Sequence, residues 1–207
     1  MRRQTPYPDA NGMIKRERHW LARAVCIVVS ALLSLPSPAL ADEALWSLLK
    51  KGGQVVLMRH AVTNSGIGDP PGFRLDDCST QRNLSDQGRR DARRVGSEFR
   101  ARNIALEIVY SSPWCRCIET AELAFGKSEI SAALSNLFTH PENRELQVRE
   151  MRELISAPGP HNRVLVSHGA TIVALTGVSL GTAEMLIVTP LSDGRFVVNG
   201  RLSAHAP

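Results

Sequence analysis

Short apolar runs alternate with longer amphipathic stretches from about residue 42 to the end of the chain. The runs are rich in β-branched residues and are bounded by Gly, Pro or small polar residues, which is typical of buried strands. We predict strands at Val55–His60, Ile108–Ser111, Arg163–His168, Glu184–Val188 and Phe196–Asn199, and helices at Asp42–Lys51, Ser85–Arg102, Arg116–Ala124, Glu142–Ile155 and Ala170–Leu175. The alternation predicts an α/β fold, a three-layer α/β/α sandwich with a mostly parallel central sheet.

One long segment, Ala61–Asn83, breaks this pattern directly after the first strand. It is rich in Gly, Pro and Asp. Loops of this length inside a compact domain are usually functional. We therefore expect the segment to act as a lid over a binding site.

Basic and imidazole side chains stand where the predicted parallel strands end. Arg59-His60 closes the first strand, Arg116 follows the Ser111-Ser112-Pro113 strand end, and Ser167-His168-Gly169 closes a later strand. Each has an ordinary alternative, since an Arg or His at a strand end is often only a solvated rim residue. Ligands of open α/β sheets bind at the carboxyl edge, so the recurrence at equivalent ends favours a site for an anionic substrate and points towards phosphate chemistry.

These residues resemble the signature of the histidine phosphatase superfamily, also called the phosphoglycerate mutase-like superfamily. The resemblance covers roughly Gln54 to Val188 and includes the helix start Leu84-Ser85-Asp86-Gln87-Gly88. Two positions depart from the family pattern: Ala61 replaces the glycine after the first histidine, and Val62 replaces the glutamate after that. The missing glutamate argues against a mutase.

The resemblance implies a reaction through a phosphorylated histidine. His60 would attack the phosphorus, Arg59 and Arg116 would bind the phosphate oxygens with planar guanidinium groups, and His168 would donate a hydrogen bond to the transferred group. Substrate-binding hydrogen bonds are expected from Thr63, Asn64 and the backbone of Gly169.

The acid that protonates the leaving group is less well marked. Glu142 and Glu145 fall at the distance after Arg116 at which many family members carry a glutamate; we take Glu142 as the candidate and keep Glu145 as an alternative. The family's leucine–x–glutamate pattern would instead place Asn136 at this position. Glu142 and Glu145 also suit the first turn of a helix, so Asp69, Asp76 and Asp77 of the long loop stay open as alternatives.

Residues 1–41 read as a signal peptide rather than as part of the fold. A basic segment precedes the apolar run Leu21–Leu35, and Ala39-Leu40-Ala41 forms a cleavage signal, so we expect cleavage after Ala41. An uncleaved anchor is the alternative, although the run is short for a span of about 20 residues; Met13 is an alternative start. Residues 42–207 then form one histidine phosphatase domain, with a periplasmic or secreted location.

Removing residues 1–41 also removes most of the positive charge. The whole chain has a net charge of +5, whereas residues 42–207 carry 19 basic and 18 acidic residues. The arginines of the predicted Ser85–Arg102 helix alternate with acidic residues and lack interleaved aromatics, so no nucleic-acid partner is expected. Peripheral contact with an anionic membrane surface stays open, as does the oligomeric state.

Three cysteines remain after residue 41, and an odd count in an oxidising compartment indicates one disulfide and one spare thiol. Cys115 and Cys117 are poorly spaced to pair with each other, so we expect Cys78 to pair with one of them. Zinc-like ligand spacing is missing from the sequence, and neither a metal nor another cofactor is expected.

The sequence therefore predicts an exported hydrolase of phosphate monoesters. Export also argues against a mutase, whose substrates are cytosolic, and suggests a small-molecule or lipid-linked phosphate ester such as an envelope phosphosugar. The alternatives are a phosphohistidine-protein phosphatase and a non-catalytic module that binds phosphate or sugar phosphate.

Overall fold

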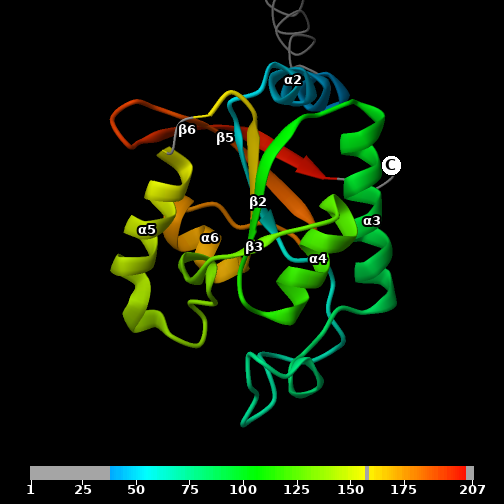
Figure 1. Ribbon diagram of the computed structural model, residues 1–207, viewed down its shortest axis with the longest axis vertical. Helices are drawn as coiled ribbons and strands as arrows, with labels where there is room; N and C mark the ends of the chain where they lie inside the picture. The colour runs from blue at the N-terminus through cyan, green and yellow to red at the C-terminus, as the bar shows by residue number, and fades with distance from the viewer. Residues whose placement is uncertain (1–37, 157–158, 204–207) are drawn as a thin grey trace, which may run out of the picture. The chain divides into compact units, whose positions relative to one another are not determined.

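The computed structural model describes residues 38–156 and 159–203 of the 207-residue chain (Figure 1). Two compact units are distinguished, Met1–Ala41 and Asp42–Pro207. The predicted signal peptide lies outside the described residues, apart from its end: helix α2 (Pro38–Lys51) includes Ala41, so the expected cleavage point falls within a helix. No helix in the described part of the chain is long and apolar enough to cross a membrane.

A six-stranded sheet forms the centre of the second unit, in the order β3-β2-β4-β1-β5-β6. Its strands are β1 (Val55–Arg59), β2 (Leu106–Ser111), β3 (Glu129–Ile130), β4 (Asn162–Ser167), β5 (Glu184–Pro190) and β6 (Phe196–Ser203). The β3-β2-β4-β1 pairs are parallel, and β5 runs antiparallel to both of its neighbours. The predicted mostly parallel sheet is confirmed, with one reversed strand.

Helices cover both faces of this sheet, as predicted. Helices α3 (Asp86–Ala101) and α4 (Cys115–Phe125) lie on one side, and α5 (Arg144–Ser156) and α6 (Gly169–Thr176) lie on the other (Figure 1). Parallel strands need such crossover helices, and the helices in turn bury both faces of the strands. The three-layer α/β/α architecture is therefore confirmed.

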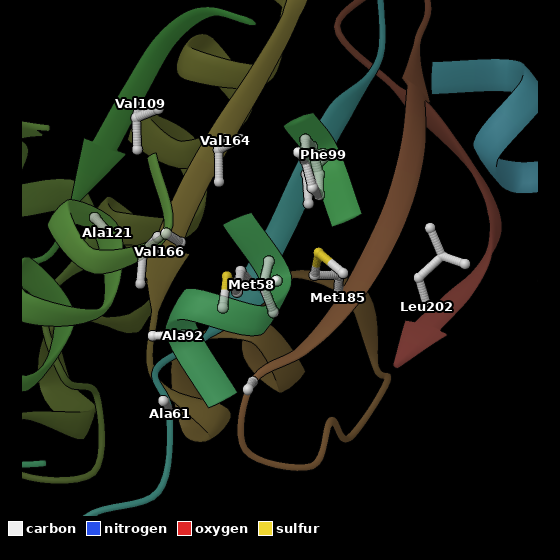
Figure 2. Close-up of a cluster of buried hydrophobic side chains, with 14 of the residues drawn as sticks. Met58, Ala61, Ala92, Phe99, Val109, Ala121, Val164, Val166, Met185 and Leu202 are labelled. Carbon is white, nitrogen blue, oxygen red and sulfur yellow. The ribbon is translucent and has the colours of Figure 1, made fainter. Parts of the chain in front are cut away.

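Alternate residues of the strands feed two separate apolar cores. In β1, Val56 and Met58 face the α3–α4 core, whereas Val55 and Leu57 face the α5–α6 core. Figure 2 shows the first of these cores, where Met58 from the sheet lies among side chains that include Ala92 of α3. Burying one such aliphatic side chain stabilises the fold by roughly 1.5–3 kcal/mol, so the strand that ends at the candidate nucleophile is firmly held.

The start of α3 explains the Leu-Ser-x-x-Gly pattern. Ser85 caps the helix by accepting a hydrogen bond from the Gly88 N–H at 3.1 Å, and its own N–H donates to the Val62 carbonyl at 2.9 Å. A Cβ at Gly88 would lie 2.0 Å from that same carbonyl oxygen. Only glycine lets the first helical turn approach the chain this closely, two residues after His60.

Two element predictions need correction. The helix expected from Glu142 begins at Arg144, because Pro141–Asn143 forms a 3-10 turn before it. The two-residue edge strand β3 was not predicted; its short, exposed sequence carries no alternating pattern.

Candidate active site

The parallel pairing of β1 and β4 brings both histidines to one edge of the sheet. Arg59 pairs with Ser167 in register, and the His60 N–H donates to the Ser167 carbonyl at 2.9 Å. The next residue of β4's chain is His168, whose ring centroid lies 5.4 Å from that of His60. The two imidazoles are thus placed together by backbone pairing.

Helix α4 adds Arg116 to the same edge. The Ser112 N–H donates to the Val166 carbonyl at 2.9 Å, which fixes the start of the segment. Further along the helix, the Thr120 hydroxyl accepts a hydrogen bond from the Ala61 N–H at 3.1 Å. Helix α4 is therefore hydrogen-bonded to Ala61, the residue after His60. The buried Arg116 of this helix lines the same cleft as His60.

These four side chains line one cleft of about 460 Å³. The other side chains around it are contributed mainly by the long loop and by α6. The lining residues are Arg59, His60, Gly66, Ile67, Gly68, Arg82, Arg116, Asn136, Phe138, His168, Gly169, Ala170, Val173 and Ser179. The sequence prediction that Arg59, His60, Arg116, His168 and Gly169 share a site agrees with this geometry.

The environment of His60 determines which ring nitrogen keeps a free lone pair. Its Nδ1 lies 2.8 Å from the Ala61 carbonyl oxygen. A carbonyl only accepts, so Nδ1 carries the hydrogen and Nε2 keeps the lone pair. Burial lowers the pKa of His60 from 6.5 to about 3; the Ala61 carbonyl opposes this shift, and the guanidinium groups of Arg116, Arg59 and Arg82 add to it. His60 is therefore neutral at physiological pH, as the predicted role of nucleophile requires.

His168 is oriented from behind by hydroxyl and thiol groups. Its Nε2 lies 2.8 Å from the Ser112 hydroxyl oxygen and 3.5 Å from the Cys117 sulfur. If the Ser112 hydroxyl donates to Nε2, the hydrogen of the neutral ring lies on Nδ1, which is buried and has no partner among the described residues. Burial, followed by the charge of its neighbours, lowers the pKa of His168 well below 6.5. A neutral ring with an available N–H fits the predicted donor role.

Arg116 is held by a buried ion pair with Asp69 of the long loop. Its Nη1 donates to Asp69 Oδ1 at 2.7 Å, with 1% and 0% of the two side chains exposed. Asp69 Oδ2 also accepts from the Trp114 indole at 3.0 Å. Burial raises the pKa of Asp69, but hydrogen bonds and the Arg116 charge outweigh it and lower the pKa overall. Asp69 is thus an ionised group that orients Arg116, and the low pKa does not suit the acid role left open for it.

Arg82 is a third guanidinium at the cleft that the sequence reasoning missed. Its Nη1 donates to the Thr63 hydroxyl at 2.6 Å and to the Gly66 carbonyl at 3.0 Å. Thr63 itself does not line the cleft, so its contact with the site passes through Arg82. A basic residue two positions before the Leu84-Ser85 helix start was the available signal, because that helix start lies close to His60.

Of the predicted substrate-binding residues Asn64 and Gly169, the structure brings only Gly169 to the cleft. Asn64 is exposed and lies outside the cleft lining, so the structure does not bring it to the site. Gly169 lines the cleft at the first turn of α6, where a Cβ would lie 3.4 Å from the Arg59 guanidinium carbon. Its backbone remains available to an anion at the helix start.

Glu142, the candidate acid, lies away from the cleft. Its carboxylate is exposed and 3.1 Å from His140 Nδ1. A backbone hydrogen bond and the one with His140 lower its pKa, whereas a general acid needs a raised one. The 3-10 turn directs the segment into solvent, and the alternatives Glu145, Asp76 and Asp77 do not line the cleft either.

Asn136 lines the cleft instead, at the position given by the leucine–x–glutamate comparison. It is buried, and its side-chain oxygen accepts from the Phe138 N–H at 3.1 Å. An amide can donate a hydrogen bond but does not supply a proton as a carboxylic acid does. Leaving groups that depart without strong acid assistance suit this arrangement.

A disulfide ties the long loop to the start of α4. Cys78 is bonded to Cys115, the residue before Arg116. This confirms the expectation that Cys78 pairs with one of the two nearby cysteines. Cys117 is the spare thiol, and burial raises its pKa to about 12. Among the described residues, no three His, Cys, Asp or Glu side chains come together as a metal site would need.

The comparison with protein families identifies the class. Residues 55–147 match the model of the histidine phosphatase superfamily (branch 1). Over these residues the chain is similar to the histidine phosphatase superfamily, and both histidines and both arginines of the family signature lie at one cleft. A search of curated proteins gave no match.

Solved structures show the same fold at low sequence identity. The protein histidine phosphatase SixA in complex with tungstate has a TM-score of 0.55 and 18% identity, covering 73% of this chain and 97% of that one. The product of the open reading frame Rv3214 from Mycobacterium tuberculosis has a TM-score of 0.56 and 19% identity, covering 73% and 98%. A phosphoserine phosphatase mutant from Entamoeba histolytica, in complex with phosphoserine, has a TM-score of 0.54 and 15% identity, covering 73% and 97%.

Proposed function

We propose that this protein is an exported phosphatase that hydrolyses phosphate monoesters through a phosphohistidine on His60. One observation carries the proposal. Four buried nitrogen atoms of cleft residues have no hydrogen-bond partner among the described residues: Nε of Arg59, Arg82 and Arg116, and Nδ1 of His168. Leaving a buried donor unpaired costs about 1–3 kcal/mol, and the oxygens of a phosphoryl group are acceptors that would satisfy these donors.

The charge of the site also fits a phosphate monoester. Both histidines are neutral, and Asp69 offsets one of the three guanidinium charges at the cleft. Two positive charges remain, which match the dianion that a phosphate monoester carries above its second pKa of about 6. A neutral alcohol or a carboxylic ester would leave this charge unbalanced.

The reaction follows from the same placements. Nε2 of His60 attacks the phosphorus, the phosphorus–oxygen bond to the leaving group breaks, and the leaving oxygen takes the electron pair and then a proton from solvent water. The Nδ1–H bonded to the Ala61 carbonyl stabilises the ring as positive charge develops on it. Water then attacks the phosphohistidine and releases inorganic phosphate, which restores neutral His60.

The cleft rim suggests a substrate with an apolar portion beside its phosphate. Ile67 and Phe138 are 92% and 62% exposed although they are large apolar side chains, and both line the cleft with Val173. Such a rim suits an amphiphilic leaving group, which includes lipid-linked phosphosugars of a cell envelope. The Cys78–Cys115 disulfide supports export, because disulfides persist in oxidising compartments.

A phosphohistidine-protein phosphatase is the second candidate, and Asn136 is the observation in its favour. The imidazole of a phosphohistidine is a good leaving group, which an amide at the position of the acid would suffice to assist. Hydrolysis of a panel with poor and good leaving groups separates the two candidates: an alkyl phosphate, a lipid-linked phosphosugar, para-nitrophenyl phosphate and a phosphohistidine peptide.

The His60→Ala variant tests the mechanism itself. Removing the nucleophile should reduce turnover of para-nitrophenyl phosphate by about 10⁴-fold or more and abolish the acid-labile phosphoenzyme trapped by rapid quench. His140→Ala is the matched control, because His140 is exposed and lies outside the cleft. A phosphoenzyme that persists in His60→Ala would exclude the assignment. Phosphate binding without any turnover by the wild type would instead indicate a non-catalytic module.

A further inference from the structure

Arg82 is built into the cleft by the long loop. Its Nη1 is held by Thr63 and Gly66, and its Nε is buried with no partner among the described residues. No carboxylate in the described part of the chain forms an ion pair with it. Holding a partly buried cation without an anion is unfavourable, which indicates that the site is arranged for an anionic ligand.

The pairing of Asp69 with Arg116 explains why the site needs a third guanidinium. Its Oδ1 accepts from Arg116 Nη1 at 2.7 Å and from the backbone N–H of Arg82 at 3.0 Å. The pair with Asp69 is buried and ionised, so much of the Arg116 charge is balanced inside the protein before any substrate arrives. Without Arg82, the site would offer a phosphate dianion only one net positive charge, that of Arg59, because Asp69 balances the charge of Arg116.

We propose that Arg82 is a third phosphate-binding arginine, which donates from Nε to the phosphoryl group and supplies the charge that Asp69 withdraws from Arg116. Thr63 acts as a positioning residue, because its hydroxyl fixes the Arg82 guanidinium through Nη1. This inference deepens the proposed function and rests on the same cleft. It gives the loop a direct part in substrate binding rather than only a covering role.

Burial and the nearby Arg116 guanidinium lower the pKa of Arg82, with Asp69 opposing and Arg59 adding to the shift. Mutual repulsion among three cations raises the free energy of the unliganded site. A bound dianion removes that repulsion, so the binding of phosphate should depend steeply on each guanidinium.

Inorganic phosphate is the probe that separates this inference from the catalytic proposal. Calorimetry should show about 10- to 100-fold weaker phosphate binding for Arg82→Gln, the loss of one charge-assisted contact. Arg82→Lys should recover part of the affinity, since it keeps the charge but not the planar fork. Arg90→Gln, on the exposed face of α3, removes the same charge at a distance and should change the affinity little.

Thr63 provides a second test that leaves every charge in place. Thr63→Val should raise KM for para-nitrophenyl phosphate several-fold with kcat nearly unchanged, because Arg82 loses one of the two acceptors of its Nη1 and keeps only the Gly66 carbonyl. Thr63→Ser retains the hydroxyl and should keep KM near the wild-type value. An unchanged phosphate affinity in Arg82→Gln would overturn the inference. An unchanged KM in Thr63→Val would overturn the positioning role of Thr63. Because phosphate binding needs no turnover, failure of the His60 mechanism would leave the calorimetric result intact.

Discussion

The two sides of the cleft are built in different ways. On the framework side, Arg59, His60 and His168 follow strands whose side chains fill both apolar cores. On the loop side, Asp69 and Arg82 belong to a segment with few regular hydrogen bonds, held by a disulfide and by polar contacts. The framework places the His60 nitrogen proposed to react, whereas the loop sets the charge around it. Substitutions in the loop should therefore change the charge of the cleft without displacing His60, and substitutions in the framework should do the reverse.

Arg116 connects the two sides of the cleft, and its removal should have the largest effect on the free energy of unfolding. Arg116→Gln removes the cation that pairs with the buried Asp69 carboxylate, which should lower the free energy of unfolding by about 3–5 kcal/mol. Arg59→Gln is the matched control, because among the described residues the Arg59 side chain has one hydrogen bond, from Nη1 to the Leu180 carbonyl at 2.8 Å. Its loss should cost about 1–2 kcal/mol. Urea unfolding measures both. Equal losses would show that Asp69 does not depend on Arg116.

The disulfide is the next connection to break. Replacing Cys78 and Cys115 together by Ser should lower the free energy of unfolding by about 2–4 kcal/mol, since the bond closes a loop with a sequence separation of 37. Phosphate affinity should fall as well, because the loop that carries Asp69 and Arg82 loses its attachment to α4. Treating the wild type with a reductant should reproduce both changes and leave the double variant unaffected. Unaltered phosphate affinity would mean that polar contacts alone order the loop.

The smallest expected effect is on pH dependence. His60 has a pKa of about 3 in the folded protein against 6.5 for the ordinary group. Below about pH 6.5 the unfolded chain binds this proton and the folded chain does not, so the free energy of unfolding should decrease as pH falls towards 3. Nuclear magnetic resonance should show no protonation of His60 between pH 8 and 5, with the signal assigned from His60→Ala. A titration centred near 6.5 would contradict the burial described here.

Residues fixed by backbone periodicity were predictable from the sequence. Val55–Met58 and Val164–Val166 are apolar enough to identify buried strands, and parallel pairing then brings their ends together. The same reasoning found Arg116, because the helix start that carries it follows a strand end. The three-layer fold and most of the candidate phosphate-binding residues could be predicted from this one rule.

Residues fixed by tertiary contacts were not predictable. Glu142 was chosen by its distance along the sequence, but a proline turn exposes it, and the buried Asn136 lies at the cleft instead. Arg82 acquires its place only when the loop folds back so that Thr63 can accept its hydrogen bond. No local pattern encodes a contact between residues so far apart in an irregular segment.

The antiparallel bridge between Thr63 and Leu84 brings the two ends of the loop together where it leaves and rejoins the framework. A loop whose two ends lie side by side, as in compact Ω-loops, can be replaced without displacing the elements that it connects. Its length and sequence can diverge without moving the strand that holds His60. Evolution could thus change the substrate by changing the sequence of this one surface loop while His60 keeps its position.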